Sequence, residues 1–382
     1  MKKKRVGIDF HAVDGKFQGS RTHILELFSQ VIEVSPDLDF YLFVDDTDGL
    51  GKLNAAFSRE NVHLIRMPAA SPFKRLLRQL PQLAKQYSLD VLHTQYILPP
   101  LMPCSGMVTI HDVLFETHPQ FFEAFFRFRS RMMMRWSAKR AAHVFTVSEY
   151  SKTELSRLYG VESEDVTVIH NAVDFGRFCP GVEGADVVKA RGLVSNQYIL
   201  SVGRLEPRKN HATLIKAYAS LKFDDLPLVI VGQRDFRYGE IFSLIKSCGI
   251  EDRVVILEDV SDDELPVLYR HASLFVYPAF AEGFGMPPLE AMASGVPTIS
   301  SDTTAIPEVV GEAGLLVSPF EVPELAASMR KVLIDQVLSE KMRRAGLERA
   351  KKFSWRASAE RVRAQYMKHF NDVGGAENEF LA

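Results

Sequence analysis

The sequence predicts an α/β protein with two doubly wound domains, each built on a parallel sheet. Short runs of β-branched and aromatic residues alternate with segments of helical periodicity through both halves of the chain. A loose stretch from 173 to 195, which contains Gly176, Pro180, Gly181 and Gly184, separates the halves. The 382 residues, 46% of them hydrophobic and 25% charged, suffice for about two or three ordinary domains.

The first half contains the β-rich runs of the first predicted sheet. Segments such as 22–34 and 151–159 lie between these runs and have the periodicity of crossover helices that join parallel strands. The expected strands are 5–10, 40–44, 62–66, 90–94, 107–111, 143–147 and 166–170. We place the end of this domain, 1–180, within the loose stretch.

The second half repeats the pattern, and Gly, Pro or an acidic turn follows each β-rich run. The expected strands are 198–202, 228–231, 254–257, 274–277, 296–300 and 315–317. A second domain therefore covers 181–352, and a polar helical tail covers 353–382. Ligands of doubly wound domains bind beyond the carboxyl ends of the strands, so residues directly after strands are the candidates for function.

The stretch from 281 to 300, AEGFGMPPLEAMASGVPTIS, combines a loop, a short helix and a strand. Pro287 and Pro288 suit the first turn of a helix, and Gly295 suits its end, which predicts a helix over 287–294. Gly283 and Gly285 precede this helix. Backbone N–H groups there, together with the positive end of the helix dipole, predict an anion site.

Two carboxylates flank this anion site. Glu282 precedes the glycines, and Glu290 is expected on the first helical turn. Carboxylates in such places bind hydroxyl groups, so a phosphate with hydroxylated groups on both sides, as in a nucleotide sugar, fits the pattern. The alternative is a plain connection from strand to helix whose glycines only turn the chain.

Three cations follow the strand expected at 198–202, in the segment GRLEPRKN: Arg204, Arg208 and Lys209. Two cations at the end of a strand can bind a diphosphate, each through charge-assisted hydrogen bonds worth about 1.5–3 kcal/mol. Protein cations could thus take the place of a metal ion. The alternative is a solvated basic turn.

His111 and Asp112 end the apolar run MVTIHDV, where the imidazole could donate to a sugar hydroxyl. The loop 15–21, GKFQGSR, precedes a helix and could bring Gly19 against a phosphate. Asp46 and Asp48 have the Asp-x-Asp spacing of a metal-diphosphate site, but their glycine-containing loop favours an acidic turn. No histidine has a partner at zinc-ligand spacing, so we expect no metal.

Composition restricts the partners and the location. A net charge of -2 and a pI near 6.6 argue against general nucleic-acid binding. No run reaches the roughly 18 apolar residues of a membrane-spanning helix, and we expect a chain without a leader. The three cysteines, Cys104, Cys179 and Cys248, have neither metal nor disulfide spacing, which predicts a reducing, cytoplasmic location.

The segment 121–140, FFEAFFRFRSRMMMRWSAKR, interleaves aromatic and Met residues with six cations and contains one acid, Glu123. The segment 73–87 has a similar character. Such a composition favours peripheral contact with an anionic membrane, at about 1 kcal/mol per cation near the surface. The alternative is a stripe that faces the core and has one solvated side.

These motifs together resemble retaining GT-B glycosyltransferases of glycosyltransferase family 4, over nearly the whole chain. The segment EGFGMPPLEAMASGVPTIS is similar to the Glu-x7-Glu segment of the family, and GRLEPRKN is similar to its diphosphate-binding strand end. The segments TIHD, VSEYSK, IHNAVD and DVSDDELPVLY occur in the family's order.

The resemblance implies two Rossmann-like domains that face each other across a cleft. The first, 1–180, would lie on the acceptor side, the second, 181–352, would bind the nucleotide-sugar donor, and the C-terminal tail, 353–382, would return to the first domain. It implies four catalytic residues: Glu282 and His111 on the donor sugar, and Arg204 and Lys209 on the diphosphate. The base would lie near Glu258 to Val260, and Glu290 would hold the ribose. The implied donor-binding residues are Gly19, Glu258, Val260, Gly283, Phe284, Gly285, Met286 and Glu290. Many relatives have a double glycine where this chain has Gln18-Gly19-Ser20.

The expected function is metal-independent transfer of a hexose, with retention of the anomeric configuration, from a nucleoside diphosphate to an acceptor hydroxyl. Likeness to polysaccharide-assembly members favours GDP-mannose, and the basic aromatic segment favours a lipid-linked acceptor of the O-antigen or capsule type at the inner membrane face. A UDP-sugar donor is an open alternative. So are a non-catalytic nucleotide-sugar sensor or scaffold and a sugar-nucleotide epimerase or hydrolase on the same fold.

Overall fold

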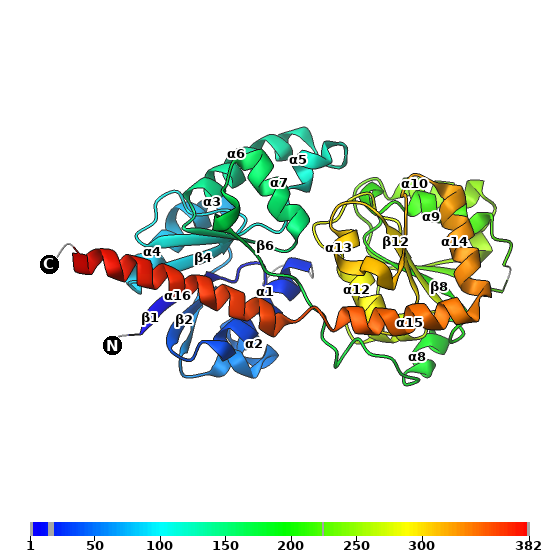
Figure 1. The fold of residues 1–382 in the computed structure, drawn as a ribbon, viewed down its shortest axis with the longest axis horizontal. Coiled ribbons are helices and arrows are strands. Elements are labelled where there is room, and N and C mark those ends of the chain that lie inside the picture. The colour runs from blue at the N-terminus through cyan, green and yellow to red at the C-terminus, as the bar shows by residue number, and fades with distance from the viewer. Residues whose placement is uncertain (1–2, 14–18, 224, 380–382) are drawn as a thin grey trace. The chain divides into compact units, whose positions relative to one another are not determined.

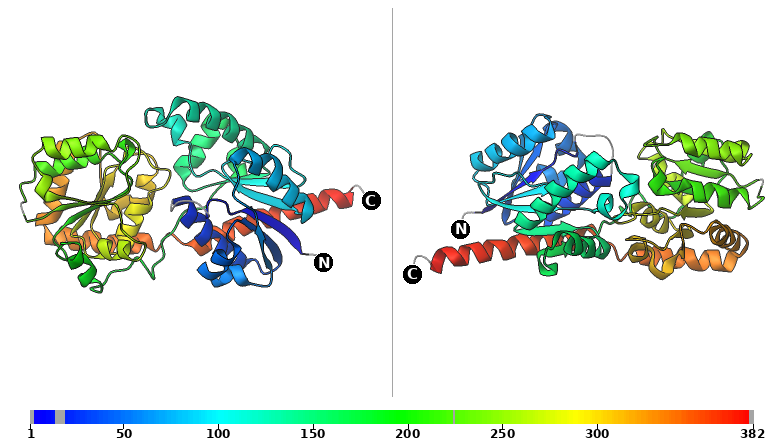
Figure 2. Two further views of the ribbon diagram at one scale, coloured as in Figure 1. Left: turned by 180° about the vertical axis from the view of Figure 1, so that it is seen from behind. Right: turned by 90° about the horizontal axis from the view of Figure 1, so that it is seen from above.

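The structure is a computed structural model that describes residues 3–13, 19–223 and 225–379. These residues form two compact units (Figure 1). Unit 1 comprises Met1–Asn171 together with Ser354–Ala382, and unit 2 comprises Ala172–Phe353. Each unit contains one parallel sheet with helices on both faces, as Figure 2 shows from two further sides. The fold class expected from the sequence is confirmed.

The sheet of unit 1 has seven strands in the order β3-β2-β1-β4-β5-β6-β7. The strands are β1 Lys4–Asp9, β2 Leu38–Val44, β3 Val62–Arg66, β4 Val91–Gln95, β5 Ser105–Thr109, β6 His143–Thr146 and β7 Val166–Val168. The helices are α1 Gly19–Val34, α2 Thr47–Leu53, α3 Pro72–Lys74, α4 Leu80–Gln86, α5 Leu114–Thr117, α6 Ala124–Arg140, α7 Glu149–Tyr159 and α16 Trp355–Glu379. A π-helical segment, η2 Arg75–Gln79, joins α3 to α4, and short 3₁₀ turns lie at η1 Ala55–Ser58, η3 Pro119–Phe121 and η4 Ser163–Asp165.

The sheet of unit 2 has six strands in the order β10-β9-β8-β11-β12-β13. The strands are β8 Ile199–Val202, β9 Leu228–Val231, β10 Val254–Leu257, β11 Leu274–Tyr277, β12 Thr298–Ser301 and β13 Leu315–Val317. The helices are α8 Ala185–Ala190, α9 His211–Ala219, α10 Gly239–Ser247, α11 Glu264–Arg270, α12 Met286–Ala293, α13 Ile306–Val310, α14 Val322–Ile334 and α15 Gln336–Ala350. The 3₁₀ turns are η5 Pro207–Lys209, η6 Glu251–Arg253 and η7 Gly311–Ala313.

The central strands form because their residues are buried on both faces, as is typical of parallel sheets. All four residues of β9 and of β11 are buried, and Ile199 of β8 belongs to one hydrophobic cluster with Leu228 and Ile230 of β9 and with side chains of α9 and α14. The run expected at 296–300 begins two residues later, at Thr298, because Pro297 has no N–H to donate. The runs expected to end at His111 and His170 end at Thr109 and Val168.

The boundary between the domains lies earlier than the expected position at 180. Asn171 still belongs to unit 1, where its side chain binds His23 of α1, whereas the ring of Phe178 already contacts Tyr269 of unit 2. Arg270 of unit 2 also donates to the Arg177 carbonyl, at 3.0 Å. The chain therefore joins unit 2 within the glycine-containing stretch, because these contacts hold residues before Pro180 against the second core.

The C-terminal helix α16 lies with unit 1 and packs against α1 (Figure 1). Tyr366 of α16 and His93 of β4 are both fully buried, and the Tyr366 hydroxyl lies 2.6 Å from His93 Nδ1. The other ring nitrogen, Nε2, lies 2.8 Å from Thr109 Oγ1. Burial lowers the pKa of His93 to about 3, so this imidazole is neutral at physiological pH. Its partners thus join the last helix to the centre of the first sheet.

Replacing this tyrosine tests the connection. Tyr366→Phe should cost about 1–3 kcal/mol of stability in unit 1, because it leaves His93 Nδ1 buried without a partner. The two tryptophans of the sequence, Trp136 and Trp355, both lie in unit 1, so tryptophan fluorescence during guanidinium unfolding reports this unit. Tyr218→Phe in unit 2 is the control and should leave the unfolding midpoint of unit 1 unchanged. An unchanged midpoint for Tyr366→Phe would contradict the assigned hydrogen bond.

Candidate functional site

The order of strands reverses once in unit 2, between β8 and β11. The chain proceeds from β8 to β9 and β10 on one side and then returns to place β11 on the other side of β8. Loops diverge from the carboxyl ends of the strands at such a reversal, which is where doubly wound sheets bind ligands. The residues that follow these two strands form the main polar cluster of the unit.

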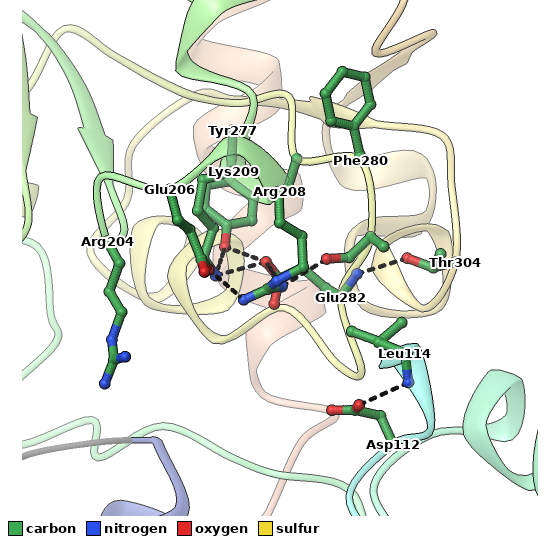
Figure 3. A network of polar contacts seen from close by, with 12 residues as sticks. Asp112, Leu114, Arg204, Glu206, Arg208, Lys209, Tyr277, Phe280, Glu282 and Thr304 are labelled. Atoms are coloured by element: carbon green, nitrogen blue, oxygen red, sulfur yellow. Dashed lines mark hydrogen bonds and ion pairs between the residues drawn. The ribbon is translucent and has the colours of Figure 1, made fainter. Parts of the chain in front are cut away.

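Glu282 is the centre of this cluster (Figure 3). Its Oε1 accepts hydrogen bonds from Lys209 Nζ at 2.6 Å, Arg208 Nη1 at 2.8 Å and the Tyr277 hydroxyl at 2.8 Å. Its backbone N–H donates to Thr304 Oγ1 at 2.9 Å. Only 12% of the Glu282 side chain is exposed, so the carboxylate depends on these donors rather than on water.

Electrostatics keeps this carboxyl group ionised. Burial alone would raise the pKa of Glu282, but the charges of Arg208 and Lys209 and their hydrogen bonds hold it below its ordinary value. Burial lowers the pKa of Lys209, and the charge of Glu282 opposes that effect. Two cations thus share Glu282, and Glu206 also pairs with Arg208, so two carboxylates balance the two positive charges of the cluster.

The loop after β8 positions the cations. Arg208 also donates to the Ala281 carbonyl and to Glu206 Oε1, both at 2.7 Å, so its guanidinium joins the two loops of the site. Asn210 adopts a left-handed conformation at φ 56° and is the N-cap of α9. Its side chain donates to the carbonyls of Pro278 and Pro319, at 2.9 and 2.7 Å, which fixes the turn that places Lys209.

Helix α12 begins at Met286, close to the expected start. Gly285 precedes it with φ 119°, a conformation that an L side chain rarely adopts, so this position requires glycine. Gly283 and Phe284 are buried, and the Phe284 ring contacts Phe353 at 5.7 Å. The side chain of Phe284 therefore belongs to the core of unit 2, and only its backbone can take part in donor binding.

Glu290 is the fifth residue of α12 and not the fourth, because the helix begins at Met286 and not at Pro287. Its Oε2 accepts a hydrogen bond from the hydroxyl of Tyr269, on α11, at 2.8 Å. Burial raises the pKa of Glu290 to about 7, although the Tyr269 hydroxyl and the charge of Arg177 oppose the shift. A carboxyl group in this state gains from new hydroxyl donors, such as those of a ribose.

The other residues proposed for the donor lie outside this cluster. Arg204 pairs with Asp235 at 2.7 Å, and both side chains are partly exposed. Glu258 pairs with Arg234 at 2.9 Å. The guanidinium of Arg234 lies over the rings of Tyr238 and Phe242. Val260 is half-buried in the loop after β10. These groups are accessible at the same edge of the sheet, beyond the ends of β8, β9 and β10.

Unit 1 contains the remaining proposed residues. His111 lies just after β5, is 8% exposed, and places Nε2 at 3.0 Å from Gln95 Oε1. Burial holds its pKa well below the ordinary value, so it is a neutral imidazole. Gly19 is the first residue of α1, and residues 14–18 of the loop before it lie outside the described residues.

Asp46 is the N-cap of α2 and accepts from Gly49 N at 2.8 Å. Among the described residues, no group of three or more His, Cys, Asp or Glu is arranged to hold a metal ion.

The structure thus brings Glu282 and Lys209 together and places Arg204 elsewhere. Sequence reasoning did not assign Arg208 or Tyr277 to the site, although the structure gives both a direct bond to Glu282. Arg208 was visible in GRLEPRKN, and Tyr277 was visible as a polar residue that ends an apolar strand. Thr304 had no sequence signal, because its contact arises only when β12 lies beside β11.

Two protein-family profiles match the chain. The profile described as "Glycosyl transferases group 1" matches residues 189–351, and "Glycosyltransferase Family 4" matches residues 19–177. Among curated relatives, O-antigen chain mannosyltransferase B of Escherichia coli is 34% identical over 258 residues, which cover 65% of this chain and 67% of that protein. O-antigen chain mannosyltransferase RfbU of Salmonella typhimurium is 33% identical over 59% of this chain and 60% of its own length.

Solved structures share the fold over almost the full length. The sucrose-phosphate synthase of Thermosynechococcus elongatus has a TM-score of 0.77 at 21% identity and covers 97% of this chain and 100% of its own. HepE of Anabaena, solved with UDP and glucose, has a TM-score of 0.76 at 18% identity. The match covers 96% of this chain and 100% of HepE. At these identities the likeness establishes the two-domain GT-B fold.

The raised pKa of Glu290 predicts a dependence of stability on pH. Its native pKa of about 7 lies above the ordinary 4.5, so the fold is most stable while the carboxyl group is protonated and loses stability as pH rises from about 4.5 to 7. Glu290→Gln keeps an acceptor for Tyr269 and removes the buried charge. It should raise stability by about 1–2 kcal/mol at pH 8 and leave it unchanged near pH 4.

Chemical unfolding at both pH values measures this difference. Glu312→Gln, at an exposed position of the same unit, is the control and should have no effect at either pH. Equal effects of Glu290→Gln at pH 4 and pH 8 would contradict the assigned ionisation.

Proposed function

The chain belongs to glycosyltransferase family 4 and is a glycosyltransferase with the GT-B fold, and we propose that it transfers mannose from GDP-mannose to a hydroxyl of a polysaccharide precursor. The relatives at 34% and 33% identity are named O-antigen chain mannosyltransferases, which supports both the sugar and the polysaccharide acceptor. Because the matches cover about two thirds of the first relative and less of the second, the donor and the acceptor are part of the proposal.

The observation that carries the proposal is the shared pairing of Glu282 with Lys209 and Arg208 beside the start of α12. A nucleoside diphosphate would bring its oxygens to these cations, and the N–H groups at Gly285 and Met286 could bind the remaining oxygens. Glu282 would then accept hydrogen bonds from the sugar. Glu290, eight residues further along the chain, would accept them from the ribose. The spacing of the two carboxylates thus matches the two hydroxylated ends of the donor.

The proposed reaction retains the anomeric configuration without a covalent enzyme intermediate. Glu282 is engaged by three donors, which disfavours a role as nucleophile. The anomeric carbon would lose its bond to the diphosphate oxygen and gain one to the acceptor oxygen on the same face, and the acceptor proton would pass to the departing diphosphate. Lys209 and Arg208 would stabilise the charge that develops there, so we propose no metal requirement.

The decisive variant is Glu282→Gln. Glu282→Ala would leave two buried cations without their carboxylate, at a cost of about 3–5 kcal/mol, whereas Gln keeps the shape. Turnover of GDP-mannose should fall about 100-fold or more. Thermal shifts with GDP, UDP and ADP identify the base, EDTA tests the metal requirement, and NMR of the product gives its anomeric configuration.

Glu240→Gln, at an exposed ion pair of the same unit, is the matched control and should keep wild-type turnover. Wild-type activity of Glu282→Gln would contradict the role assigned to Glu282 in sugar transfer. Binding without turnover of any sugar nucleotide would favour a sensor, and turnover that needs no acceptor would favour an epimerase or hydrolase.

We also propose that the enzyme acts on a lipid-linked acceptor at the inner face of the membrane, as a peripheral protein. Among the described residues, no helix is both long and apolar enough to cross a bilayer. The proposed contact is therefore one made by a surface. The outer face of α6 supports this. Phe125, Phe128, Met132 and Trp136 recur at helical spacing and are 76%, 65%, 58% and 37% exposed.

The opposite face of α6 is buried and contains Ser130, Met134, Ser137 and Ala138. The large apolar side chains therefore point outward, contrary to the alternative of a core-facing stripe. Arg129, Arg135 and Lys139 flank them, and in the described part of the chain none of these three has an ion-pair partner. Apolar side chains between unpaired cations are the pattern of an interfacial helix on anionic lipid.

Vesicle binding tests this surface. Vesicles with phosphatidylglycerol should bind the protein at low salt and shift Trp136 emission to the blue, and binding should weaken as salt rises. Phe128→Ser should weaken binding without loss of stability, because the side chain is exposed. Phe320→Ser, at an exposed position of unit 2, is the control and should bind as wild type does. No binding to anionic vesicles at low salt would remove the membrane proposal.

A further inference from the structure

Arg234 and Glu258 form an exposed ion pair beyond the ends of β9 and β10. Both Nε and Nη2 of Arg234 lie 2.9 Å from Glu258 Oε1. Of the two side chains, 51% of Arg234 and 35% of Glu258 are exposed. A ligand at this edge of the sheet can therefore reach both charged groups.

Two aromatic rings support the guanidinium of Arg234. Its Cζ lies 5.1 Å from the ring centroid of Tyr238 and 5.2 Å from that of Phe242, within the range of cation–π contacts. The two rings are nearly perpendicular, with an interplanar angle of 88°. A guanidinium confined in this way loses less conformational freedom when it binds a ligand. Because exposed ion pairs add little to stability, this support points to a role in binding.

The backbone attaches Arg234 to the loop that carries Lys209. Arg234 and Leu205 form an isolated parallel bridge, and the Leu205 N–H donates to the carbonyl of the residue before Arg234 at 2.9 Å. Gly232 approaches this loop so closely that a Cβ there would lie 2.0 Å from the Gly203 carbonyl oxygen. The loops after β8 and β9 are thus joined, and Arg234 keeps a fixed place relative to the cations proposed for the diphosphate.

The ion pair presents an acceptor next to donors. Among the described residues no group donates to Glu258 Oε2, because Arg234 binds only Oε1. A guanidinium has five N–H groups, and the bonds to Glu258 use two of them. The exposure of the side chain leaves further N–H groups open to a ligand. A group that binds here therefore needs a donor and an acceptor side by side.

We propose that Arg234 and Glu258 recognise the lactam edge of the donor's base, which is guanine in the donor proposed above. In guanine the N1–H donor lies next to the O6 acceptor. Glu258 Oε2 accepts from N1–H, and a guanidinium N–H of Arg234 donates to O6. This inference rests on the glycosyltransferase function proposed above, and it adds the residues that select the base.

Adenine has the opposite pattern at this edge, with an acceptor at N1 and an amino donor at C6. The Glu258 carboxylate would face a lone pair, and the N–H groups of Arg234 would face amino hydrogens. Because the ribose and diphosphate fix the orientation of the base, adenine cannot exchange the two positions. The pair therefore selects against adenine as well as for guanine. Uracil and cytosine differ in the same way, since only uracil has the lactam edge.

Inosine diphosphate (IDP) and ADP are the decisive probes, because their bases differ only at this edge. Isothermal titration calorimetry with the full-length protein gives the dissociation constant of each nucleotide. IDP should bind the wild type at least about tenfold more tightly than ADP, because ADP loses a hydrogen bond to a charged group. GDP, which has the same edge, should bind at least as tightly as IDP.

Two variants test the two residues. Glu258→Gln replaces a carboxylate that only accepts with an amide that also donates, so the preference for IDP over ADP should largely disappear. Arg234→Met keeps an apolar stem on the two rings and removes the donors, so it should weaken IDP about tenfold more than ADP. Both side chains are exposed, so both variants should keep the wild-type melting temperature without ligand.

The next ion pair along the chain provides matched controls. Arg237 and Glu240 pair at the start of α10, and their side chains are 56% and 60% exposed. Arg237→Met and Glu240→Gln remove the same chemical groups from a neighbouring position. Both variants should keep the wild-type preference for IDP.

Three results would overturn this recognition: IDP and ADP bind the wild type equally, Glu258→Gln keeps the wild-type preference, or Arg234→Met weakens both nucleotides alike. Tighter binding of UDP than of GDP, with CDP disfavoured, would support recognition of the lactam edge and contradict GDP-mannose as the donor. Failure of the proposed function is a separate outcome, namely no turnover of any sugar nucleotide by a protein that still prefers IDP to ADP.

Discussion

The parallel direction of the strands is the constraint on which the proposed donor site depends. Within each sheet every described pair of neighbouring strands is parallel, so all carboxyl ends lie at one edge. Each sheet begins in its interior and reverses once, beside its first strand. Two strand ends with diverging loops therefore meet at β8 and β11 in unit 2 and at β1 and β4 in unit 1. Polar and charged residues follow the strand ends at both places.

The charges around Glu282 fix the geometry of the proposed donor site before a donor binds. In this cluster the carboxylate is held by two cations and a tyrosine hydroxyl, which lowers its pKa and fixes its position. The proposed donor would not need to create this arrangement, only to bring its diphosphate to the same cations. The nearby Glu290 is the opposite case, since burial with one hydroxyl partner raises its pKa. The two carboxylates of one motif thus reach different states because only one has cations beside it.

The sequence predicted most of the fold because buried parallel strands are continuous apolar runs bounded by turns. It predicted α12 within one residue because Pro and Gly mark helix ends at particular positions. It misplaced the domain boundary, since the contacts of Asn171 and Phe178 that decide it are tertiary. It named Arg208 among the cations of GRLEPRKN without assigning it to the site, and it passed over Tyr277. Both residue types are common at surfaces, and only the folded loops bring a carboxylate to them.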